Sequence, residues 1–166
     1  MKSMSRGKLG LSGVAVLALL LVVIPPAGAA EGVTREEFVK QAEPICKTNV
    51  LANKRIFKGA KAEVKAGKLK LASTHFFRAA TAFGRTIRQL AAVPRPPEDE
   101  AKLDRWFEVL RDEKRLIEKI GRALAVGDKH RAESYSVDLN RNSNLANNTV
   151  LGFGFAYCRI DPSRFG

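Results

Sequence analysis

The sequence predicts an all-α protein, in which an antiparallel up-down four-helix bundle carries a C-terminal extension stapled to the first helix by a disulfide. Three observations favour this fold. Long segments repeat apolar residues at spacings of three and four, short turns rich in glycine or proline separate them, and the two cysteines lie near opposite ends of the predicted domain. Amphipathic helices joined by short turns bury their apolar faces together as a bundle.

The N-terminal residues 1–29 predict a secretory signal peptide. Basic residues precede an apolar run over residues 14–24, and the following PPAGAA supplies a helix break and a small-residue cleavage site. The apolar run is shorter than the roughly 20 residues that a membrane span needs. We therefore expect one helical domain over residues 30–166, secreted or held in the cell envelope. The alternative is an uncleaved signal sequence that anchors the protein in the membrane.

The first helix of the domain is expected to begin at Thr34, because T-R-E-E forms a capping box. Its apolar spacing continues to about Ala66, and Gly67 is a natural stop. Pro44 lies inside this helix, where a proline costs about 3 kcal/mol. Since the apolar spacing keeps its phase across Pro44, we expect a kink and no break.

Three further helices are expected. The second covers about residues 68–92 and ends at VPRPP, which forms a stiff connection. The third begins at Pro97 or Glu98, has acidic residues in its first turn, and closes at Gly127. The fourth begins at Asp128, a good N-cap, and ends near the glycines at 152 and 154. The remaining residues form the C-terminal extension.

Cys46 and Cys158 are the only two cysteines. An exported protein meets an oxidising compartment, where pairing is the default. In an up-down bundle the first helix begins at the end where the fourth finishes, so the extension can fold back to Cys46. We therefore predict a disulfide between Cys46 and Cys158.

Other roles for these cysteines find little support in the sequence. A cysteine nucleophile needs a base, and neither His75 nor His130 lies in a catalytic motif. The C-x-x-C-H sequence of a c-type haem is absent, and a zinc site would need both cysteines and both histidines to converge. We expect no catalytic residue, no metal site, no cofactor and no enzymatic activity.

Basic residues are concentrated in one half of the domain. The chain has a formal net charge of +12, and the segment from Lys40 to Arg95 holds thirteen Lys or Arg against two acidic residues. The candidate polyanion-binding face comprises Lys47, Lys54, Lys58, Lys61, Lys65, Arg78 and Arg85. The ordinary interpretation is a solvated face. The functional one is a surface for anionic envelope polymers or acidic membranes.

No base-reading motif accompanies the basic residues, so sequence-specific nucleic-acid binding is not expected. The fourth helix is rich in asparagine, at positions 140, 142, 144, 147 and 148, and Asn49 and Asn53 lie on the first. This pattern is typical of a polar face with one or two buried amides that fix helix register. The alternative is a small polar pocket between the first and fourth helices.

Two short motifs carry a resemblance to known proteins. T-x-x-E-F-x-x-x-A-x-x-x-C, followed by an asparagine, is formed by Thr34, Glu37, Phe38, Ala42, Cys46 and Asn49, and G-x-x-x-C by Gly154 and Cys158. With the signal peptide, these motifs resemble a loose group of small secreted or envelope-associated actinobacterial proteins of unknown function. Pro44 departs from the helical part of that pattern. The resemblance implies an exported helical domain and no particular activity.

Two functions follow as hypotheses. The first is a non-enzymatic binding or interaction module of the cell envelope, with the basic face as its contact surface. The alternative is a soluble carrier that holds a small ligand in a pocket between helices.

Overall fold

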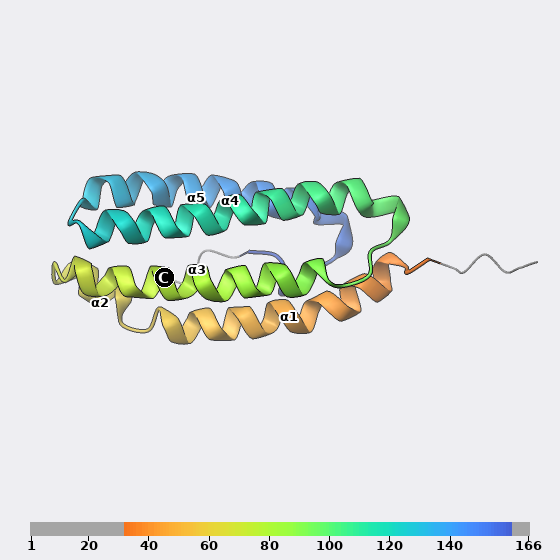
Figure 1. The fold of residues 1–166 in the computed structure, drawn as a ribbon, viewed down its shortest axis with the longest axis horizontal. Coiled ribbons are helices and arrows are strands. Elements are labelled where there is room, and N and C mark those ends of the chain that lie inside the picture. The colour runs from red at the N-terminus through yellow and green to blue at the C-terminus, as the bar shows by residue number, and fades with distance from the viewer. Residues whose placement is uncertain (1–31, 161–166) are drawn as a thin grey trace, which may run out of the picture. The chain divides into compact units, whose positions relative to one another are not determined.

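The computed structural model describes residues 32–160 of the chain (Figure 1). Its elements are α1 (Arg35–Ile56), α2 (Ala60–Lys65), α3 (Leu69–Ala91), η1 (Pro97–Asp99), α4 (Glu100–Ala125), α5 (Lys129–Thr149) and η2 (Leu151–Phe153). These described residues contain helices and no strand, which confirms the predicted all-α class. The predicted signal peptide and the end of the C-terminal extension lie outside the described residues.

The start of α1 agrees with the predicted capping box. The Thr34 hydroxyl accepts the Glu37 N–H at 3.2 Å, and the Thr34 N–H donates to the Glu37 carboxylate at 2.9 Å. The Thr34 N–H, together with the Thr34 hydroxyl, donates to the Glu37 carboxylate, and this holds the pKa of Glu37 below its usual range. The helix continues across Pro44 without a break, as predicted.

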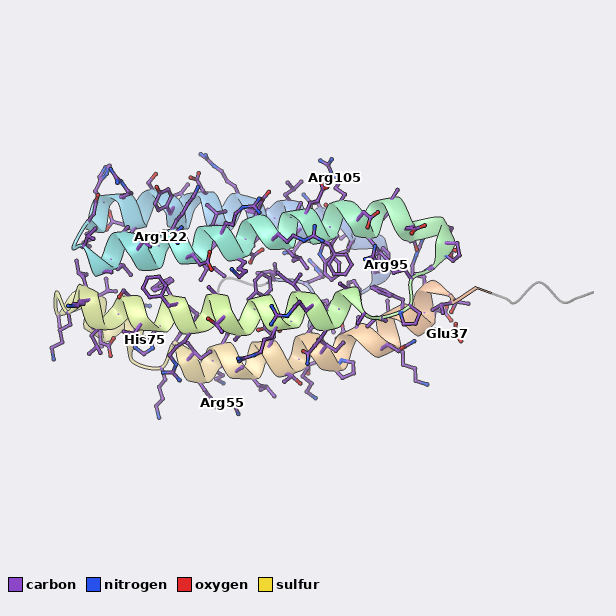
Figure 2. All side chains as sticks on the ribbon, viewed as in Figure 1. Glu37, Arg55, His75, Arg95, Arg105 and Arg122 are labelled. Atoms are coloured by element: carbon purple, nitrogen blue, oxygen red, sulfur yellow. A yellow bond between two sulfur atoms is a disulfide. The ribbon has the colours of Figure 1, made fainter. Side chains whose placement is uncertain are left out.

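The prediction of one continuous helix to Ala66 is wrong. The chain leaves the helix after Ile56, and the short helix α2 begins only after Gly59. Gly59 has a φ of 92°, a left-handed conformation that glycine adopts without steric cost. The His75 ring on α3 lies against this turn, and its two nitrogens contact the Ile56 carbonyl oxygen and the Glu63 carboxylate (Figure 2). A contact from a distant helix therefore helps to fix the break.

The helices pack in sequence order around an apolar core. The main contacts join α1 with α3, α3 with α4, and α4 with α5, while α2 lies on α3. One core cluster surrounds the buried side chains of Phe38, Trp106 and Phe107, and a second lies where α3, α4 and the start of α5 meet. Phe155 stacks on Trp106, with ring centroids 5.7 Å apart, so the segment after α5 also belongs to the core.

A buried ion pair joins the start of α1 to the start of α4. Asp99 is 1% exposed, and it accepts hydrogen bonds from the Arg35 guanidinium at 2.5 and 2.7 Å and from Lys102 at 3.2 Å. The Arg35 hydrogen bonds are the main reason that the pKa of Asp99 lies below its usual value. This pairing fixes the position of α1 at one end of the domain.

Candidate ligand-binding cavity

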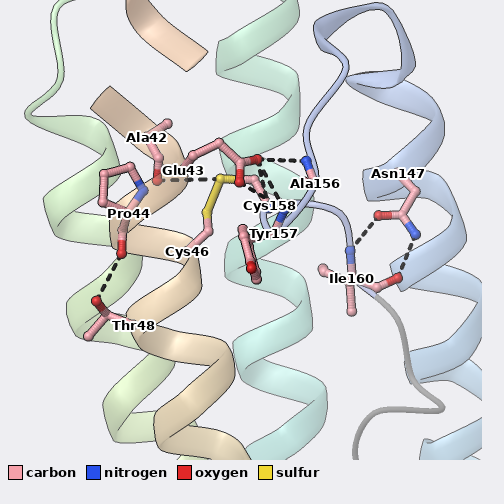
Figure 3. Close-up of a disulfide and its surroundings, with 10 residues drawn as sticks. All are labelled: Ala42, Glu43, Pro44, Cys46, Thr48, Asn147, Ala156, Tyr157, Cys158 and Ile160. Atoms are coloured by element: carbon pink, nitrogen blue, oxygen red, sulfur yellow. Dashed lines mark hydrogen bonds between the residues drawn. A yellow bond between two sulfur atoms is a disulfide. The ribbon is translucent and has the colours of Figure 1, made fainter. Parts of the chain in front are cut away.

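The predicted disulfide is formed. Cys46 on α1 and Cys158 in the C-terminal segment are bonded, with their Cα atoms 5.0 Å apart (Figure 3). The two residues are separated by 112 positions in the sequence, so the bridge closes almost the whole domain. Hydrogen bonds also attach the C-terminal segment to α1, next to this covalent link.

Glu43, three residues before Cys46, binds the same segment through its carboxylate. The carboxylate accepts the backbone N–H of Ala156 at 2.8 Å, that of Tyr157 at 3.0 Å, and that of Cys158 at the longer distance of 3.5 Å (Figure 3). Hydrogen bonds from backbone N–H groups to a carboxylate are charge-assisted and stronger than neutral ones. In the sequence Glu43 looks like an ordinary helix-surface acid, so this role was not predicted.

Asn147 on α5 holds the other side of the segment. Its amide Nδ2 donates to the Ile160 carbonyl oxygen at 2.7 Å, and its Oδ1 accepts the Ile160 N–H at the same distance (Figure 3). Residues 156–160, which we call the strap, are therefore bonded to α1 on one side and to α5 on the other.

The helices and the strap line a cavity of about 600 Å³ that is partly open to solvent. Its lining comes from α1 to α5 and from the strap, and most of it is apolar. The apolar lining residues include Val50, Phe57, Val64, Phe76, Ala79, Phe83, Leu90, Trp106, Leu110, Ile117, Ile120, Leu124 and Leu139. Cavities of roughly 300–1,000 Å³ with mainly hydrophobic walls are typical sites for small ligands.

Three polar atoms in the cavity lining are buried without a hydrogen-bond partner among the described residues. They are the indole Nε1 of Trp106 and the side-chain oxygens of Asn49 and Asn53. Trp106 is 1% exposed and Asn53 is 7% exposed. Buried polar atoms are nearly always paired, so three unpaired atoms on residues that line one cavity are unusual.

The asparagines of α5 divide among several roles. Asn140 lines the cavity, Asn142 donates to the Val109 carbonyl oxygen at 3.0 Å, and Asn147 holds the strap. Asn144 and Asn148 are exposed. Partly buried amides on α5 thus bond to α4 and to the strap, and the cavity beside them is larger and more apolar than the small polar pocket of the alternative.

Replacing Asn53 by leucine should stabilise the empty protein by about 1–3 kcal/mol, because an unpaired buried amide oxygen is removed from an apolar wall. The matched change is Asn147→Leu, which breaks two hydrogen bonds to Ile160 and should lower stability. Urea unfolding of both variants measures the two effects. A loss of stability in Asn53→Leu would show that its amide oxygen is satisfied in the folded protein.

Glu113 on α4 is a buried acid in the same cavity lining. The residue is 4% exposed, and its carboxyl group accepts the Ser143 hydroxyl at 3.2 Å and lies 3.5 Å from the Asn142 amide. Burial outweighs these two hydrogen bonds and raises the pKa of Glu113 to about 8. At neutral pH this carboxyl group is therefore mostly protonated and can donate a hydrogen bond.

A signal for Glu113 was present in the sequence. The apolar face of α4 includes Leu110 and Ile117. Glu113 lies on the same face, three residues after Leu110 and four residues before Ile117. An acid at a core position of a helix is unusual. The buried position of Glu113 was not predicted from this interruption of the apolar face.

The predicted basic face is spread over several elements. Lys47 and Lys54 lie on α1, Lys58 in the turn, Lys61 and Lys65 on α2, and Arg78 and Arg85 on α3. All seven side chains are exposed, and the ion pairs between described residues involve none of them. The turn after α1 separates them, so they do not follow one continuous helix. Only Lys61 and Lys65 line the cavity.

Within residues 32–160, no group of three or more His, Cys, Asp or Glu side chains is arranged to hold a metal ion. His75 contacts the turn after α1, whereas His130 is exposed at the start of α5, away from both cysteines in the disulfide. None of the helices in this part of the chain is long and apolar enough to cross a membrane.

Comparison of the chain with protein-family models, with curated proteins and with solved structures finds no match. The resemblance to small secreted actinobacterial proteins therefore stays a prediction.

Proposed function

We propose that this is an exported, non-enzymatic binding protein of the cell envelope that holds a small, largely apolar molecule in the interhelical cavity. In this proposal the helices form an up-down four-helix bundle around the ligand. The observation that carries it is the cavity of about 600 Å³, with apolar walls and unpaired polar atoms on Trp106, Asn49 and Asn53.

The size of the cavity argues against an incidental packing gap. Protein interiors are packed as densely as organic crystals, and voids larger than a water molecule are few. An apolar-walled space of this volume leaves much apolar surface in contact with water, and a ligand with an apolar surface would remove that surface from water.

Filling part of the cavity with a larger side chain should weaken ligand binding. We expect Val50→Trp, which places an indole in the lining, to weaken binding of the neutral fluorescent probe phenylnaphthylamine at least about tenfold. The matched control is Val137→Trp, which puts the same side chain on α5 at a position that is 50% exposed and outside the cavity. Probe titration of the disulfide-bonded protein measures both.

Two outcomes would contradict the proposed cavity site. Either the probe fails to bind the unaltered protein, or both tryptophan variants bind it as well as the unaltered protein does. A circular dichroism spectrum of Val50→Trp shows whether the variant is folded.

The basic face supports a second candidate function, the binding of anionic envelope polymers or an acidic membrane surface. It rests on the seven exposed basic side chains, none of which is neutralised by an ion pair among the described residues. Such binding would weaken steeply with salt, because exposed charges are screened. Co-sedimentation with anionic and zwitterionic vesicles at low and high salt distinguishes it from cavity binding.

A further inference from the structure

The rim of the cavity differs in chemistry from its interior. Six lining residues are exposed to solvent, and we call them the rim: Lys61, Lys65, Lys129, Glu133, Asn140 and Arg159. They belong to α2, to α5 and to the strap. Figure 1 places α2 and the start of α5 at the same end of the domain. The rim is therefore built where the cavity meets solvent.

Four of the six rim residues are basic and one is acidic. Glu133 lies 3.7 Å from Lys129, so its charge is partly offset within α5. The ion pairs among the described residues leave Lys61, Lys65 and Arg159 without an acidic partner. The rim thus presents uncompensated positive charge beside an apolar interior, and this charge is complementary to an anion.

The interior would reject an anion that the rim accepts. An ionised group loses its hydration when it enters an apolar cavity, and this costs several kcal/mol unless it is paired. The Glu113 carboxyl group is subject to the same cost, since burial raises its pKa to about 8. A negatively charged ligand group is therefore stable at the lysines of the rim and unstable beside Glu113.

We propose that the ligand is a single-chain anionic amphiphile, which places its hydrocarbon chain in the cavity and its anionic head group at Lys61 and Lys65. This inference rests on the proposed function, because it requires that the cavity binds a ligand. The proposed site thus combines the cavity with Lys61 and Lys65, two residues of the predicted basic face. Arg159 supplies a further positive charge to the rim.

The head group is tested with ligands that share one hydrocarbon chain. Dodecanoate, dodecyl phosphate, dodecanol and dodecyltrimethylammonium, each below its micelle concentration, compete with bound phenylnaphthylamine in the disulfide-bonded protein. We expect the two anions to displace the probe at about tenfold lower concentration than dodecanol, and the cation to be the weakest. The two anions distinguish a carboxylate head group from a phosphate head group.

The position of the head group is tested with two double variants of equal charge change. Lys61→Glu with Lys65→Glu alters the rim, whereas Arg78→Glu with Arg85→Glu alters exposed residues of α3 outside the cavity lining. We expect the rim variant to lose about tenfold in dodecanoate affinity and to keep its affinity for dodecanol. The α3 variant should bind dodecanoate within about twofold of the unaltered protein.

The outcomes separate the two proposals. Equal displacement by all four ligands, or equal loss of dodecanoate affinity in both double variants, overturns the anionic amphiphile while the cavity site stands. Failure of every chain compound to displace the probe also overturns it. If the probe itself does not bind, the proposed function fails and this inference fails with it.

Discussion

Reduction of the Cys46–Cys158 disulfide is expected to lower the free energy of unfolding by about 4–5 kcal/mol. The cross-link closes a loop of 112 residues, and in the chain-entropy account a loop of this length restricts the unfolded chain by about that amount. Typical domains are stable by only about 5–15 kcal/mol. The bridge therefore provides a large part of the expected stability, and the melting temperature should fall by on the order of 15 °C.

The measurement is urea unfolding of the oxidised protein, of the reduced protein, and of the double variant Cys46→Ser with Cys158→Ser. The last two should agree, since both remove the covalent link between the strap and α1. Glu43 and Asn147 still hold the strap through hydrogen bonds, so the reduced protein should retain its helical spectrum. A change below about 1 kcal/mol would mean that those hydrogen bonds already restrict the chain as strongly as the bridge does.

Glu113→Gln should stabilise the protein at alkaline pH by on the order of 4–5 kcal/mol. The pKa of Glu113 is about 8 in the folded protein and about 4.5 in an unfolded chain. Each unit of difference corresponds to about 1.4 kcal/mol. Glutamine keeps a neutral side chain of nearly the same volume beside Ser143, so it avoids the cost of ionising a buried acid.

The sign of the pH dependence follows from the raised pKa. Below about pH 4.5 Glu113 is protonated in both states, and the favourable contribution of its neutral form is fully present. Between about pH 4.5 and pH 8 the unfolded chain loses this proton and the folded protein keeps it. Raising the pH through this window therefore favours unfolding, and above about pH 8 the contribution is lost.

Unfolding curves at several pH values test this dependence. The stability difference between Glu113→Gln and the unaltered protein should be small near pH 5 and should grow toward pH 8. Glu108→Gln is the matched control, because Glu108 lies on the same helix with an exposed side chain. If the two variants depend on pH in the same way, the Glu113 carboxyl group is not buried from water as described.

The sequence predicted the features that depend on local signals or on simple counting. The capping box at Thr34 acts within one helical turn, and it was confirmed with its two hydrogen bonds. The disulfide followed from having two cysteines and a predicted signal peptide. Helix boundaries at Gly67 and Gly127 also agreed with the structure to within two residues, because both glycines adopt positive φ values.

Other features depend on residues that are far apart in the sequence. The break after Ile56 is held by His75, 19 positions later, and it falls in a segment whose apolar spacing predicted a continuous helix to about Ala66. The attachment of the strap to Glu43 spans more than 110 positions. Helical periodicity indicates which side of a helix faces inward, and it does not give the separation between helices. The cavity could therefore not be derived from it.

The strap has a further consequence for how the protein matures. Its residues are the last of the described chain to be synthesised, yet Tyr157, Cys158, Arg159 and Ile160 form part of the cavity lining. They are also held between α1, among the first elements made, and α5. A chain that stops before Ala156 would have every helix and still lack one wall. Under the proposed function, a chain shortened in this way should bind its ligand more weakly than the full-length protein.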